Sequence, residues 1–184
     1  MIIVDTGFWF GLLDRRDQYH SACCSFLSIC EEPLITTFPV LTESMHLLMN
    51  RGYPQQGLSL WKTLQQLHQL GKFSTFSLTD EHLPRLQQLL EQYQSLPMDL
   101  ADASLVLLAE HLGHGRIVST DERDFQTYRW KKHHPFTNLL LPYSNPRPNE
   151  SLCCCIEKLN WLSKQTATDP AASGRLQTQL PVAG

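Results

Sequence analysis

Residues 2–7 read Ile-Ile-Val-Asp-Thr-Gly, a short apolar run that ends abruptly in an aspartate, a threonine and a glycine. Such a run is typical of a buried strand of a parallel sheet that leads directly into a helix. The same order returns at residues 116–121, where Arg-Ile-Val-Ser-Thr precedes an aspartate. Because ligands bind at the carboxyl ends of strands in an open parallel sheet, we expect Asp5 and Asp121 to lie on the same edge.

Strand and helix signals alternate along the rest of the chain. Besides the strands at 2–4 and 116–119, the pattern predicts strands over residues 34–36, 73–76 and 136–141. It predicts helices over residues 8–13, 19–30, 39–50, 58–70, 83–93 (with Asp80 as the cap) and 99–111. Strands that alternate with helices indicate an α/β fold with a parallel sheet covered by helices on both faces.

Composition sets limits on the class of protein. A chain of 184 residues with 42% hydrophobic residues is long enough for one domain with a proper core. No apolar run reaches the length of a membrane span, and the N-terminus lacks the basic region of a signal peptide. Six cysteines without Cys-x-x-Cys pairs favour a reduced, cytoplasmic chain. The net charge of −3 argues weakly against a nucleic-acid partner.

The character of the sequence changes after Pro142. We expect a domain over residues 1–143, followed by a linker that begins at residue 144. An apolar stripe over residues 152–162 is compatible with one short amphipathic helix, and the polar tail over 165–184 is typical of a disordered segment. The pattern assigns no function to residues 144–184.

Acidic residues from distant parts of the chain converge on the edge that carries Asp5 and Asp121. Asp102 lies in the first turn of a helix that is apolar nearly all round, so its burial needs compensation. Asp99 shares its face, although capping of the helix explains Asp99 equally well. Glu43 follows the strand at 34–36. Carboxylates gathered in this way repel one another unless a cation lies between them, and oxygen ligands favour Mg²⁺ or Mn²⁺.

Four short motifs then resemble those of a known family. Val-Asp-Thr at residues 4–6, Thr-Glu at 42–43, Met-Asp-Leu-Ala-Asp-Ala at 98–103 and Ser-Thr-Asp-Glu-Arg-Asp-Phe at 119–125 resemble the ordered acidic motifs of PIN domains. They are similar above all to those of VapC-type toxin ribonucleases. The resemblance spans residues 1–143. The extension beyond it departs from the family pattern.

The resemblance implies a three-layer α/β/α fold with a parallel sheet of about five strands, and a divalent-metal endoribonuclease that forms a homodimer and has a cognate antitoxin. By position, the catalytic residues would be Asp5, Glu43, Asp102 and Asp121. The same four residues would bind Mg²⁺ or Mn²⁺, with Asp99 and Asp124 as additional metal positions. Thr6 and Thr120 match small hydroxyl residues that orient carboxylates or water, and simple capping explains them equally well.

The RNA substrate is inferred mainly from the resemblance. Positively charged residues after Asp121 are candidates for phosphate contacts, namely Arg123, Arg129, Lys131 and Lys132. Trp130 is a candidate for stacking on an unpaired base, although a packed tryptophan in a basic loop explains the pattern slightly better. Two alternatives remain open: a PIN nuclease of RNA processing without an antitoxin, and a catalytically silent PIN module that binds RNA or protein.

Overall fold

The computed structural model describes residues 1–96 and 98–140. The boundary expected at residue 143 and the predictions for residues 144–184 lie outside this part. Five parallel strands form one sheet, in the order β3-β2-β1-β4-β7. Their bounds are β1 Ile2–Val4, β2 Leu34–Thr37, β3 Phe73–Phe76, β4 Arg116–Val118 and β7 Thr137–Asn138. The prediction of a parallel sheet of about five strands is confirmed.

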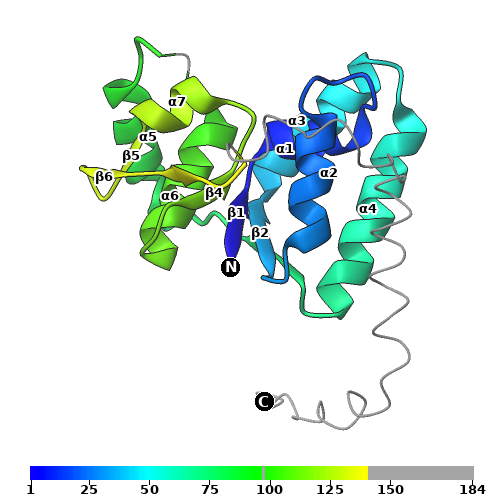
Figure 1. Ribbon diagram of the computed structural model, residues 1–184. Helices are drawn as coiled ribbons and strands as arrows, with labels where there is room; N and C mark the ends of the chain where they lie inside the picture. The colour runs from blue at the N-terminus through cyan, green and yellow to red at the C-terminus, as the bar shows by residue number, and fades with distance from the viewer. Residues whose placement is uncertain (97, 141–184) are drawn as a thin grey trace, which may run out of the picture.

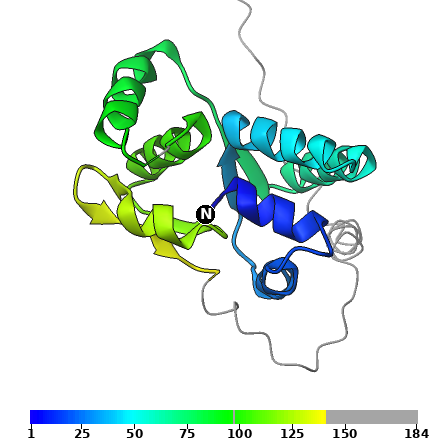
Figure 2. The ribbon, with the colours of Figure 1, turned by 90° about the horizontal axis from the view of Figure 1, so that it is seen from above.

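Helices cover both faces of this sheet. The helices are α1 Thr6–Leu13, α2 His20–Ile29, α3 Phe38–Asn50, α4 Pro54–Gln69, the 3-10 helix η1 Asp80–His82, α5 Leu83–Gln92, α6 Leu100–Leu112 and α7 Glu122–Thr127. Helices α1 to α4 lie on one side of the sheet and α5 to α7 on the other (Figures 1 and 2). The result is the expected three-layer α/β/α arrangement.

The strand order reverses next to β1. The chain builds β1, β2 and β3 in one direction and then crosses back, so that β4 pairs with the free side of β1. Ile3 pairs with Ile117 and Val4 with Val118, and all four side chains are fully buried. The carboxyl ends of β1 and β4 therefore form the switch point at which open α/β sheets bind ligands. Asp5 and Ser119 stand at these two strand ends.

Local predictions were wrong at several points. The last strand, predicted over residues 136–141, covers only Thr137–Asn138 within the described residues, and after it the side-chain oxygen of Asn138 accepts the N–H of Leu140 at 3.1 Å. Thr79 caps η1 through a capping box with His82, in place of Asp80. Helix α7 and a hairpin of β5 Arg129–Trp130 and β6 His134–Pro135 were not predicted.

Two findings concern the cysteines and the membrane. Cys23 and Cys30 are free thiols, whereas Cys24 is disulfide-bonded, so the expectation of fully reduced cysteines is wrong at this position. No helix within residues 1–96 and 98–140 combines the length and the apolar character that crossing a membrane demands.

Candidate active site

Asp5 caps the first helix at the centre of the switch point. Its Oδ1 accepts the backbone N–H of Thr6 at 2.6 Å, and its Oδ2 accepts the hydroxyl of Ser119 at 2.6 Å. The carboxyl group is buried, and this burial raises its pKa from 3.8 to about 6, with repulsion from Glu43 adding to the rise. The hydrogen bonds oppose the rise but do not cancel it. Asp5 is thus a fixed carboxylate, and none of the described residues contributes a positive charge to its pKa shift.

Glu43 reaches the same place from helix α3. This helix starts directly after β2, where the Thr37 side chain accepts the N–H of Val40 at 3.4 Å and caps it. The hydroxyl of Thr6 donates to Oε2 of Glu43 at 2.7 Å. Burial raises the pKa of Glu43, and the negative charge of Asp99 adds to this. Thr6 therefore connects two acids: its N–H holds Asp5 and its hydroxyl holds Glu43.

Helix α6 contributes Asp99 and Asp102. Asp99 is the N-cap, and its Oδ1 accepts the N–H of Asp102 at 2.9 Å, so the capping explanation for Asp99 is confirmed. Burial raises the pKa of Asp102 from 3.8 to about 8, and the charges of Asp5 and Asp99 raise it further. The hydroxyl of Tyr128 donates to Oδ2 of Asp102 at 3.0 Å. The charge of Asp99 acts on both Glu43 and Asp102. Asp99 therefore caps the helix and also belongs to the group of acids around Asp5, which we call the acidic cluster.

The end of β4 brings in Asp121. Ser119 is buried, and its hydroxyl accepts the N–H of Asp121 at 2.9 Å while it donates to Asp5. Asp121 in turn caps α7 by accepting the N–H of Asp124 at 3.1 Å. A single serine hydroxyl thus joins the two aspartates that follow β1 and β4.

Thr120 lies against the start of α1. A Cβ on Gly7 would overlap the hydroxyl of Thr120, so only glycine allows the ends of β1 and β4 to come this close. Thr120 thus contacts the backbone of the Asp-Thr-Gly segment. It is Ser119 that holds the carboxylate of Asp5.

The remaining acid, Asp124, pairs with Arg123, whereas Arg129 contacts the backbone. Asp124 is buried, and Arg123 donates to its Oδ1 at 2.8 Å. Arg129 donates through Nη1 to the carbonyl oxygens of Gln126, Thr127 and Tyr128, at 2.7, 3.0 and 2.8 Å. Both guanidinium groups therefore serve local structure around α7.

The two lysines lie farther from the acids. The backbone N–H of Lys131 donates to Oε1 of Glu110 at 3.0 Å, which places the tip of the β5–β6 hairpin at the last turn of α6. Asp99 and Asp102 lie at the first turn of that helix. Trp130 is stacked on His134, with 4.5 Å between the ring centroids, and donates to the carbonyl of Pro135. Trp130 is thus packed within the hairpin. RNA contacts by Lys131 and Lys132 stay a prediction.

The residues of the cluster fit a hard divalent cation by their chemistry. Asp5, Glu43 and Asp102 are oxygen donors, and burial raises the pKa of each. A bound cation would favour their ionised forms and relieve the repulsion between them. Within residues 1–96 and 98–140, no three acidic, histidine or cysteine side chains stand close enough to form a ready-made metal cage.

The sequence pattern does not single out three residues that contact the acids or fix the end of β4. Ser119 joins two of the acids, Tyr128 holds Asp102, and Asn138 fixes the end of β4 by pairing with the backbone N–H and carbonyl of Ser119 at 3.2 and 2.8 Å. The motif Ser-Thr-Asp offers two adjacent hydroxyls, and only the path of the chain after β4 decides which one reaches Asp5. No sequence signal marks Tyr128 or Asn138.

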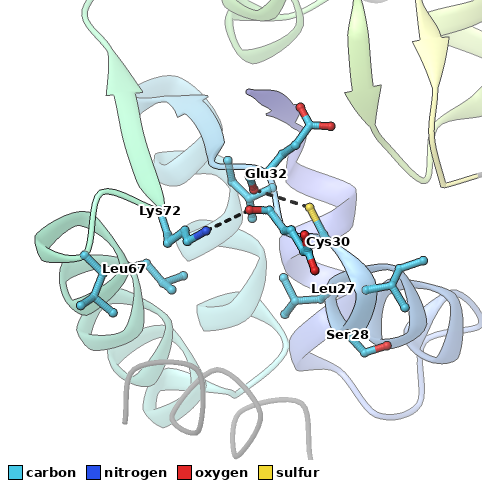
Figure 3. Close-up of a pocket in the computed structure, with 10 residues that line it drawn as sticks. Leu27, Ser28, Cys30, Glu32, Leu67 and Lys72 are labelled. Atoms are coloured by element: carbon cyan, nitrogen blue, oxygen red, sulfur yellow. Dashed lines mark hydrogen bonds between the residues drawn. The ribbon is translucent and has the colours of Figure 1, made fainter. Parts of the chain in front are cut away.

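A separate hollow lies at the opposite edge of the sheet. It opens between α2 and α4, at the beginning of β2, and its wall includes Leu27, Leu34 and Leu67 (Figure 3). Lys72 donates to the carbonyl of Glu31 at 3.0 Å at its rim. None of the acids of the cluster lines this hollow.

Comparison with known proteins supports the assignment that the geometry suggests. The PIN domain family model matches residues 2–131. This chain belongs to the PIN-domain family. The match contains the whole acidic cluster of the PIN domain, from Asp5 to Asp124.

A solved structure has the same fold. The crystal structure of VapC20 from Mycobacterium tuberculosis, described as a toxin that cleaves the sarcin-ricin loop, is similar with a TM-score of 0.58. The two chains are 18% identical, and the similarity covers 67% of this chain and 92% of VapC20. At this identity the likeness concerns the fold. No curated protein matches the sequence.

Proposed function

We propose that this PIN domain is a divalent-metal-dependent endoribonuclease of the toxin type. The observation that carries the proposal is the cluster itself: acids from the end of β1, from α3 and from α6 act on one another, and Asp121 joins Asp5 through Ser119. Burial, with repulsion from Asp5 and Asp99, raises the pKa of Asp102 to about 8, which costs free energy that a purely structural role does not explain. Family membership and the fold of VapC20 support the same reading.

We assign the roles in the reaction to these acids. Asp5, Glu43, Asp102 and Asp121 would bind Mg²⁺ or Mn²⁺, with Asp99 and Asp124 at the border of the cluster. A cation at this place would neutralise charge on the scissile phosphate and activate water for in-line attack. Ser119 keeps Asp5 aimed at the cluster, and Thr6 does the same for Glu43. The residues of β1 and β4 that lead into the cluster are buried.

The cellular setting belongs to the same proposal. A toxin-type PIN nuclease would act on RNA in the cytoplasm, form a homodimer and be held inactive by an antitoxin. VapC20 is described as a toxin that cleaves the sarcin-ricin loop. We therefore infer a substrate with an exposed loop, cut at few positions, in preference to general degradation of RNA.

The test is a cleavage assay with defined cofactors. Purified protein is incubated with total RNA and with intact ribosomes, in Mg²⁺, in Mn²⁺ and in EDTA, and the cut ends are mapped. We expect discrete cuts that require the metal and that are absent with Asp102→Asn. Equal cleavage in EDTA, or equal cleavage by the Asp102→Asn protein, would remove the proposal.

A further inference from the structure

Tyr128 occupies an enclosed position directly after helix α7. Its side chain is fully buried, and its ring packs edge-on against Tyr93 and Phe125, with centroid distances of 5.0 and 5.6 Å. Its backbone N–H donates to the carbonyl of Asp124 at 2.8 Å and ends the helix. Packing therefore fixes the ring of Tyr128 independently of any contact made by its hydroxyl.

The hydroxyl of Tyr128 reaches the acidic cluster. It donates to Oδ2 of Asp102 at 3.0 Å, and the charges of Asp102, Asp124 and Asp121 all act on it. The tyrosine thus lies between the acids of α6 and those of α7. The backbone of Asp99 also hydrogen-bonds to the carboxyl group of Asp102, and the tyrosine is the side chain that holds its Oδ2.

We propose that Tyr128 is a positioning residue that keeps Asp102 aimed at the cation. The inference rests on the proposed function, since it assumes that Asp102 binds the metal. Hydrogen bonds to the second oxygen of a metal-binding carboxylate fix its orientation and favour its ionised form, and their loss typically weakens metal binding by roughly 10- to 100-fold. A phenylalanine would fill the same enclosed space, so packing alone does not require the hydroxyl.

The neighbouring tyrosine provides a matched control. Tyr93 packs against the ring of Tyr128, and its hydroxyl accepts the backbone N–H of Arg129 at 2.9 Å. It is buried in the same aromatic group but makes no hydrogen bond to an acid among the described residues. Tyr93→Phe and Tyr128→Phe therefore each remove one hydroxyl from the same aromatic group, but only Tyr128→Phe removes a hydrogen bond to an acid of the cluster.

The test measures metal binding in two ways for the wild type and both variants. Mn²⁺ is titrated while the melting temperature is followed without RNA, and RNA cleavage is measured over the same Mn²⁺ range. For Tyr128→Phe we expect the half-saturating Mn²⁺ concentration to rise about 10-fold or more in both assays, with the maximal rate approached at high Mn²⁺. Tyr93→Phe should lower the melting temperature in EDTA and leave the Mn²⁺ dependence unchanged.

The outcomes separate this inference from the proposed function. Tyr128→Phe with the Mn²⁺ dependence of the wild type would overturn the positioning role and leave the nuclease assignment intact. Wild-type protein that binds Mn²⁺ without cutting RNA would overturn the nuclease assignment alone. An equal change in Mn²⁺ dependence for Tyr93→Phe would show that the effect comes from packing, which also overturns the proposal.

A second measurement does not depend on the folding of Tyr128→Phe. The chain has five tyrosines, and wild-type protein labelled with 3-fluorotyrosine keeps every hydroxyl. One fluorine resonance should shift as Mg²⁺ is added, and the same resonance should shift in Asp102→Asn without metal, because its hydrogen-bond partner has changed. If no resonance responds to both changes, the tyrosine does not report on the metal site and the inference fails.

Discussion

Replacing Asp102 by asparagine should stabilise the metal-free protein, and the gain should grow with pH. Asparagine keeps the shape of the side chain and an oxygen that can accept the hydroxyl of Tyr128, but it cannot ionise. Burial, together with repulsion from Asp5 and Asp99, raises the pKa of Asp102 from 3.8 to about 8 in the folded protein. Because the folded-state pKa is raised, ionisation of Asp102 does not destabilise the wild type below about pH 4, and it destabilises the folded state progressively as the pH rises from about 4 to about 8.

The magnitude follows from the size of this shift. One pKa unit corresponds to about 1.4 kcal/mol, so the difference in unfolding free energy between variant and wild type should grow by up to about 1.4 kcal/mol per pH unit between pH 4 and pH 8. The full change is on the order of 5 kcal/mol by this measure, as an upper bound. It exceeds the favourable interaction of a carboxylate with the helix dipole, which is typically ~0.3–1 kcal/mol.

Urea denaturation in EDTA at a series of pH values measures this difference. We expect the two proteins to be nearly equal near pH 4 and the variant to be clearly more stable at pH 8, while its RNA cleavage in Mn²⁺ is lost. Asp99→Asn is the control, because asparagine preserves the cap and only removes a neighbouring charge. Its effect should have the same sign and a smaller size. A variant that is less stable than the wild type at pH 8, or a difference that does not change with pH, would refute the reasoning.

Two further substitutions test the contact between β1 and β4. Ser119→Ala removes the hydroxyl that joins Asp5 to the N–H of Asp121, so cleavage should fall by roughly 10- to 100-fold, and a rate within twofold of wild type would assign the serine to packing alone. Gly7→Ala places a Cβ on the hydroxyl of Thr120 and should destabilise the fold by about 1–3 kcal/mol, measured as the shift in urea midpoint; no shift would mean that the two strand ends are free to separate.

The sequence carries enough information to place the main acids. Asp5 and Asp121 follow β-branched runs, and alternation of strands with helices implies a parallel sheet whose carboxyl ends share an edge. Glu43 can be placed because it lies early in the helix that comes after the strand at 34–36. Asp102 can be placed because it lies in the first turn of the helix that begins after Pro97. These predictions depend on periodicity over long elements, where the pattern is strongest.

The parts that were missed lack such a pattern. Helix α7 has six residues, which is too short for a helical period to show. The strands of the β5–β6 hairpin have two residues each. Its turn, residues 131–133, includes Lys131 and Lys132 at φ 44° and 72°, positions where Asn and Gly are the usual signal. Tyr128 lies between these two elements. Its contact with Asp102 spans 26 residues of sequence and depends on how α7 packs, so no local sequence pattern predicts this contact.

Direct binding of Mn²⁺ in the absence of RNA tests the central claim that the acidic cluster is a divalent-metal site. Binding can be followed by electron paramagnetic resonance of free Mn²⁺ at pH 7.5 for the wild type, Asp5→Asn, Asp102→Asn and Asp80→Asn, the last altering an exposed acid at η1 that lies outside the cluster. We predict saturable binding by the wild type and by Asp80→Asn, and at least a roughly 10-fold loss of affinity in the two cluster variants. Equal binding by all four proteins would contradict the account.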